Sequence, residues 1–106
     1  MTALGDGASA WVTDVTRPGD VDALVAGTIA DLGGIDMVVA NAGVYVGGPL
    51  WESDPDALDT LLTTNVNGVV RTVRASLPHL LERGSGDILV TSSVSGRTSY
   101  LAAGDA

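Results

Sequence analysis

Polar side chains follow three apolar runs of the sequence, and their chemistry suits the binding of a small molecule. Asp14 follows the run 8–13, Asn41 follows the run 35–40, and Ser93 follows a run that begins at residue 87. A carboxylate, an amide and a hydroxyl can together accept and donate hydrogen bonds to a ligand. A serine at the end of a strand often has no catalytic role, so Ser93 alone predicts little. The three positions together indicate a site more strongly than any one of them.

Asn65 is the most informative single residue, because it lies on the apolar stripe of a long helical pattern. It comes four residues after Leu61 and four before Val69. A buried amide must find hydrogen-bond partners or cost a few kcal/mol. Those partners could belong to its own helix, to a neighbouring loop or to a functional site.

The apolar runs are short and rich in β-branched residues. Runs 8–13 and 35–40 are therefore predicted to be buried strands, and run 87–92 to be a third strand. Helical stripes separate them, and this alternation predicts an α/β fold with a parallel sheet.

Two amphipathic helices are expected between these strands. The first begins after a cap signal at Thr16 and ends at Gly33, and the second extends from Asp54, the expected cap, to Gly84. Pro78 lies inside the second helix, where it should produce a kink or a final loose turn.

Four short motifs, in this order and on these elements, resemble those of the short-chain dehydrogenase/reductase family. They are Asp14-Val15-Thr16, Ala40-Asn41-Ala42-Gly43, Asn65-Val66-Asn67-Gly68 and Thr91-Ser92-Ser93. The resemblance covers nearly the whole chain and implies a doubly wound Rossmann fold that binds NAD or NADP at the carboxyl ends of its strands.

The resemblance also assigns roles to these residues. In the family, the residue matching Asp14 accepts a hydrogen bond from the adenine amino group, and the one matching Val15 makes a backbone contact. Asn41, Ala42 and Gly43 form the turn that passes close to the cofactor's ribose.

The same resemblance makes Asn65 and Ser93 the catalytic residues of this chain. The family's asparagine holds a water in a proton relay and stabilises a break in its helix. Its serine hydrogen-bonds the substrate oxygen and orients the catalytic tyrosine.

The family's proton donor is a tyrosine in the motif Tyr-x-x-x-Lys, and this sequence has no lysine. The family spacing would place the tyrosine at Ala106, the last residue. Tyr100 comes too early, and Gly104 stands where its lysine would be. We therefore expect Tyr100 to be a loop residue without a catalytic role, and the isolated chain to be inactive.

No glycine-rich phosphate-binding fingerprint precedes Asp14. In the 3-2-1-4-5 strand order of the fold, the runs 8–13, 35–40 and 87–92 correspond to strands three, four and five. Residues 1–106 are thus expected to be a partial NAD(P)-binding Rossmann domain, a central βαβαβ segment that lacks the first two strands and the C-terminal part. The run 8–13 should then be weakly anchored or paired elsewhere.

The composition excludes several classes of partner. The net charge is −8, and the five cations are outnumbered by thirteen carboxylates, so we expect no nucleic acid as a partner. The first ten residues show neither a basic region nor an apolar h-region, and no stretch is long and apolar enough to cross a membrane, so we expect a cytoplasmic location. His79, the single histidine, is expected at a surface or an interface.

The sequence therefore predicts a short-chain oxidoreductase that transfers a hydride between NAD(P) and a carbonyl or alcohol. We expect a small-molecule substrate and, because the second helix matches one that packs between family subunits, a homo-oligomer of the complete protein. The alternatives are a non-catalytic Rossmann fragment that acts as an interaction module, and a phosphoacceptor receiver domain, which the lack of lysine disfavours.

Overall fold

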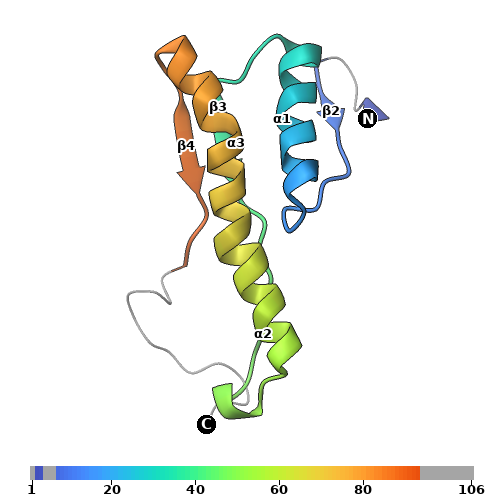
Figure 1. Cartoon of the computed structure of the whole chain (residues 1–106), viewed down its shortest axis with the longest axis vertical. Coiled ribbons are helices and arrows are strands. Elements are labelled where there is room, and N and C mark those ends of the chain that lie inside the picture. Colours follow the sequence, from blue (N-terminus) through green and yellow to red (C-terminus); the bar gives the residue numbers. More distant parts are fainter. Residues whose placement is uncertain (1, 4–6, 94–106) are drawn as a thin grey trace.

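The computed structural model describes residues 2–3 and 7–93, and the chain alternates strands and helices (Figure 1). The strands are β1 (Thr2–Ala3), β2 (Ser9–Ala10), β3 (Met37–Ala40) and β4 (Asp87–Val90). The helices are α1 (Pro18–Leu32), the 3₁₀ turn η1 (Leu50–Glu52), α2 (Pro55–Leu62), the π-helical turn η2 (Thr63–Asn67) and α3 (Gly68–Arg83).

β3 and β4 form a parallel pair in which Met37 lies opposite Asp87 and Ala40 opposite Val90. The α2–η2–α3 segment connects them, and α1 packs against α3 (Figure 1). Both strands end at the same edge, so the segments that follow Ala40 and Val90 emerge side by side. The α/β class and the parallel pairing predicted from the sequence are confirmed.

The helix boundaries agree closely with the sequence signals. Gly33 and Gly84 end α1 and α3 in the left-handed conformation, with φ of 89° and 82°. Asp54 caps α2 by accepting a hydrogen bond from the Asp56 amide at 3.3 Å. The prediction for Thr16 was wrong, because Arg17 occupies the N-cap without a side-chain cap, and the Thr16 hydroxyl instead donates to Asp14.

The long helix contains one irregular turn, and it is not at Pro78. The turn η2 includes Asn65, and the Gly68 amide bonds to the Thr63 carbonyl five residues earlier. The helix break that the family resemblance implied is therefore present. The loose turn expected at Pro78 is absent, because α3 continues through Pro78 to Arg83 and is held there by buried Leu80.

The prediction of a strand at residues 8–13 was mostly wrong. Only Ser9–Ala10 is a strand, paired antiparallel with Thr2–Ala3 in a separate sheet, and Val12 is fully exposed. A strand is buried on both faces only when a sheet surrounds it, and β2 does not join β3 and β4. The pairing agrees with the expectation that this segment is weakly anchored or pairs elsewhere.

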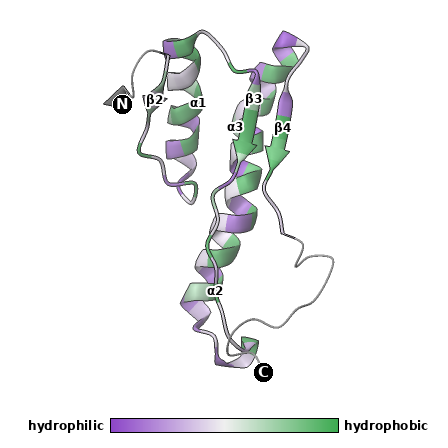
Figure 2. Ribbon diagram, turned by 180° about the vertical axis from the view of Figure 1, so that it is seen from behind, coloured by the Kyte–Doolittle hydropathy of each residue, from purple (hydrophilic) through white to green (hydrophobic). Residues whose placement is uncertain are grey.

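The sheet formed by β3 and β4 is covered on one face only. Met37, Val39 and Leu89 are each at least half exposed, and Figure 2 shows the two apolar strands in front of α3 with no described helix over them. The expectation that the run 35–40 is a buried strand was therefore only partly right, because Ala40 is buried whereas Met37 and Val39 are exposed. The radius of gyration is 16.7 Å, against about 13 Å for a compact 100-residue domain. The chain is therefore less compact than a complete domain of this size.

The amino end of the sheet is tied to the end of α3. His79 Nε2 accepts a hydrogen bond from the buried Ile35 amide at 3.1 Å, and Arg83 donates to the Ile35 carbonyl at 2.6 Å and to the carboxylate of Asp36. His79 is half-buried and has a structural role, rather than the surface or interface position expected from the sequence.

Among the described residues, no helix combines the length and the apolar character that a membrane crossing requires.

Candidate functional site

Asp14 lies in a tight turn between β2 and α1. Its Oδ1 accepts hydrogen bonds from the Thr16 amide at 2.9 Å and from the Thr16 hydroxyl at 2.6 Å. Its Oδ2 lies 3.7 Å from Nε of Arg17. One oxygen of this exposed side chain therefore fixes the turn, while the other lies beside Arg17.

Hydrogen bonds from the Thr16 side chain and backbone, followed by the charges of Arg17 and Arg71, lower the pKa of Asp14. A lowered pKa means that Asp14 stabilises the folded chain above its unfolded-state pKa, and that this contribution is lost as the pH falls through the folded-state pKa.

We predict that Thr16→Val raises the pKa of Asp14, measured by ¹³C NMR titration of its carboxyl group. An unchanged titration midpoint in this variant would show that the Thr16 hydroxyl does not hold the carboxylate.

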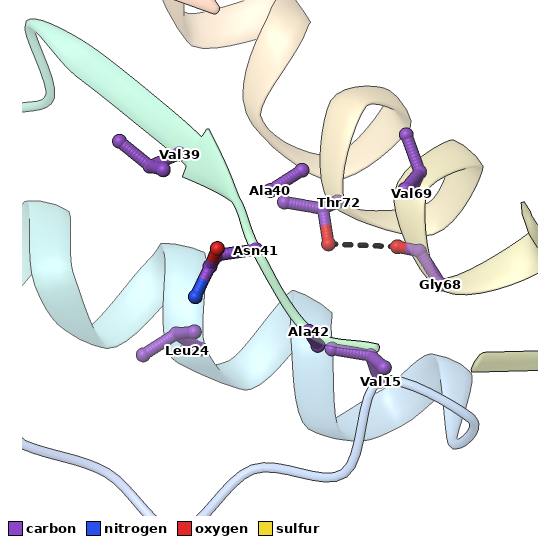
Figure 3. Close-up of a pocket in the computed structure, with 9 residues that line it drawn as sticks. All are labelled: Val15, Leu24, Val39, Ala40, Asn41, Ala42, Gly68, Val69 and Thr72. Carbon is purple, nitrogen blue, oxygen red and sulfur yellow. Dashed lines mark hydrogen bonds between the residues drawn. The ribbon is translucent and has the colours of Figure 1, made fainter. Parts of the chain in front are cut away.

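Val15 and the turn after β3 face the same small cavity (Figure 3). This cavity has a volume of about 170 Å³, and Val15, Leu24, Asn41, Ala42, Gly68 and Thr72 are among its lining residues. It is smaller than the 300–1,000 Å³ typical of ligand pockets. It is therefore too small for a dinucleotide, but it brings Val15 of one predicted cofactor segment close to Asn41 and Ala42 of the other.

Asn41 is held by Thr91, the residue that follows β4. The Thr91 hydroxyl donates to Asn41 Oδ1 at 2.6 Å, and the Thr91 amide continues the parallel ladder by bonding to the Ala40 carbonyl at 3.0 Å. This leaves the Asn41 amide nitrogen, a donor, on an exposed side chain.

Asn65 binds the loop after β3 through both ends of its amide. Its Oδ1 accepts from the Val44 amide at 2.8 Å, and its Nδ2 donates to the Val44 carbonyl, also at 2.8 Å. A Cβ added at Gly43 would lie 3.4 Å from Asn65 Oδ1. The sequence expectation that Asn65 must find partners is thus met by the loop, and the irregular turn η2 presents this amide to it.

Ser93 lies three residues beyond the end of β4 and is exposed. Tyr100, for which we expected no catalytic role, lies outside the described residues. Tyr45 and Trp51, in the loop that contains Val44 and η1, are 80% and 84% exposed. The described residues include no cluster of three or more histidine, cysteine or acidic side chains that could hold a metal ion.

Comparison with known proteins places these features in one family. A family model described as short chain dehydrogenase matches residues 1–104. The chain belongs to the short-chain dehydrogenase family. A putative short-chain dehydrogenase/reductase of Mycolicibacterium smegmatis is 40% identical over 89 residues, which are 82% of this chain and 32% of that protein.

Two further proteins similar to this chain have names that mention a cofactor. An uncharacterized NAD-dependent oxidoreductase of Mycobacterium tuberculosis is 38% identical over 78% of this chain and 30% of its own. The structure of a gluconate 5-dehydrogenase from Burkholderia cenocepacia, in complex with NADP and tartrate, superposes with a TM-score of 0.78 at 32% identity, covering 84% of this chain and 35% of that one.

The chain spans about a third of the length of these relatives, and it has a partial doubly wound Rossmann fold. Sequence reasoning missed three supporting residues of the site: Thr16, which binds Asp14, Thr91, which binds Asn41, and Arg71, which binds Val15. The first follows from its place two residues after Asp14. The other two act across fifty or more residues; Thr91 belongs to the motif Thr91-Ser92-Ser93, but the sequence pattern indicates neither of these two contacts.

Proposed function

We propose that this chain is the central part of an NAD(P)-dependent oxidoreductase that interconverts a carbonyl and an alcohol in a small-molecule substrate. Residues 1–106 supply part of its NAD(P)-binding Rossmann domain. The proposed cofactor-binding residues are Asp14, Val15, Asn41, Ala42 and Gly43, and the proposed catalytic residues are Asn65 and Ser93. Either NAD or NADP fits this proposal, since one relative is named NAD-dependent and one structural neighbour binds NADP.

The observation that supports the proposal most is the pair of hydrogen bonds between Asn65 and Val44. They hold the turn Asn41–Ala42–Gly43 against the irregular part of the long helix. An amide clamped in this way fixes the backbone beside the turn, and rigid placement of such groups is what a reacting site requires.

The polar groups of the described residues fit a nicotinamide dinucleotide at their edge of the sheet. Asp14 Oδ2, on an exposed side chain, would accept a hydrogen bond from an adenine amino group, and the Asn41 amide nitrogen would donate one to a ribose hydroxyl. Gly43 has no side chain to obstruct a ligand. When bound, the cofactor supplies or accepts the hydride, while the hydroxyl of Ser93 would hydrogen-bond the substrate oxygen.

Helix α3 supports the proposal of a homo-oligomer for the complete protein. Val70 and Leu81 on α3, together with Leu62 and Val66 just before it, are all more than half exposed. A large exposed apolar stripe on a helix is typical of an interface.

Cofactor titration and the neighbouring coding DNA test the proposal. We expect the purified chain to show no micromolar affinity for NADH or NADPH in a fluorescence titration, because it has no phosphate-binding fingerprint. We expect the DNA flanking this reading frame to encode that fingerprint upstream and Tyr-x-x-x-Lys downstream, and the joined product to oxidise NAD(P)H with a carbonyl substrate. A joined product without such activity would contradict the proposal.

A second candidate is an interaction module that performs no chemistry and associates with a complete homologue. The open face of the sheet, with Met37, Val39 and Leu89 exposed, favours it. Flanking DNA that encodes neither motif, together with a stable complex between this chain and a complete family member in analytical ultracentrifugation, would support this candidate over the oxidoreductase.

A further inference from the structure

Arg71 connects the long helix to the turn that carries Asp14 and Val15. Its Nη1 donates a hydrogen bond to the Val15 carbonyl at 3.2 Å, across 56 positions of sequence. Arg71 is half-buried, whereas Arg74, one turn further along α3, is exposed. A guanidinium stays protonated at all relevant pH values, so Arg71 can donate this hydrogen bond throughout that range.

Gly68 brings the same helix close to the side chain of Val15. A Cβ added at Gly68 would lie 2.8 Å from Val15 Cγ2, closer than real side chains approach one another. Val15 is therefore held at two points, its side chain against the backbone at Gly68 and its carbonyl by Arg71. Three residues before Gly68, Asn65 holds the other predicted cofactor segment through Val44.

We propose that Arg71 is a positioning residue that fixes the Asp14–Val15 turn against α3, so that Oδ2 of Asp14 faces an adenine ring. This inference rests on the proposed function, because the adenine contact belongs to it. The helix segment 65–71 then aligns both cofactor-binding segments: Asn65 aligns the segment after β3, and Gly68 and Arg71 align the segment after β2. Without Arg71, the β2–α1 turn would be attached to α3 at one point only.

Arg71→Met tests the proposal, because methionine keeps a long unbranched side chain and good helix propensity while it removes the donor and the charge. Arg74→Met is the matched control, and Arg71→Lys is the conservative variant. In Arg71→Met we expect amide hydrogen exchange at Thr16 and Arg17 to become about tenfold faster or more. The same change should raise the pKa of Asp14, which Arg71 helps to lower. Arg71→Lys should restore the pKa of Asp14, and Arg74→Met should leave the exchange rates unchanged.

Titration with 5′-AMP separates the positioning role from the adenine contact. In the wild type, millimolar 5′-AMP should shift the NMR signals of Asp14 and Val15, and Arg71→Met should weaken this response. If AMP shifts neither signal while Arg71→Met still speeds exchange at Thr16, the adenine role in the proposed function fails and the positioning role stands. If exchange at Thr16 and the pKa of Asp14 are the same in Arg71→Met and wild type, the positioning role is overturned, whatever AMP does.

Discussion

Leu80→Ala is expected to lower the free energy of unfolding of the chain by about 2–5 kcal/mol. Leu80 is 5% exposed and is one of four buried apolar residues among those that the structure describes. A Cβ added at Gly86 would lie 2.6 Å from Leu80 Cδ2, so this leucine fills the space between α3 and the start of β4. Its removal would loosen the packing of the parallel pair on its helix.

Leu81→Ala is the matched control for this prediction. Leu81 is the next residue of the same helix and is 70% exposed, so the same substitution should change the free energy of unfolding by less than about 0.5 kcal/mol. Urea denaturation followed by circular dichroism measures both variants. Equal losses in the two variants would mean that Leu80 is not a core residue, or that a partner covers Leu81 in solution.

The helices could be predicted from the sequence because their signals are local. Gly33, Gly84 and Asp54 act on backbone groups within one turn of themselves, so their effect does not depend on distant residues. Of the two outcomes expected at Pro78, a kink or a final loose turn, the loose turn is absent: a proline removes only one helical hydrogen bond, and α3 continues past it to Arg83. Local rules thus give helix ends more reliably than they give interruptions.

Strand burial could not be predicted, because it depends on which neighbours cover each face. Apart from Asp36, the residues of run 35–40 are apolar on both faces, as in a central parallel strand, yet Val39 is 55% exposed while Ala40 is 6% exposed. The apolar pattern is typical of a strand inside a complete sheet, whereas in the described part of the chain only one face of the sheet is covered. The run 8–13 is the extreme case, with Val12 wholly exposed.

For the site residues too, the sequence predicts what depends on a local pattern and fails for contacts with distant parts of the chain. That Asn65 needs partners follows from an amide on an apolar stripe, and the structure confirms it. The contacts of Asn65 with the Val44 backbone and of Arg71 with Val15 could not be predicted. They depend on how η2 and α3 pack against two loops that are 21 and 56 residues away in the sequence. The functional roles of Asn65 and Ser93 remain predictions from the family resemblance.

Asn65→Asp should release the loop that follows β3 while leaving the helix in place. An aspartate can still accept the hydrogen bond from the Val44 amide, but it sets a second oxygen against the Val44 carbonyl, which Nδ2 now approaches to 2.8 Å. We expect a loss of about 0.5–1.5 kcal/mol in the free energy of unfolding, because one hydrogen bond is lost and the freed carbonyl of Val44, an exposed residue, can bind water. Amide exchange at Val44 should rise with it.

Asn67→Asp makes the comparison specific to this contact. Asn67 lies two residues further along the same irregular turn and is exposed, so the substitution adds the same charge to the same part of the helix. If Asn67→Asp destabilises the chain as much as Asn65→Asp, the loss comes from negative charge in η2 rather than from Val44. If only Asn65→Asp speeds exchange at Val44, the amide of Asn65 is what holds the loop carrying Asn41–Ala42–Gly43 beside the helix, the geometry on which the proposed cofactor site depends.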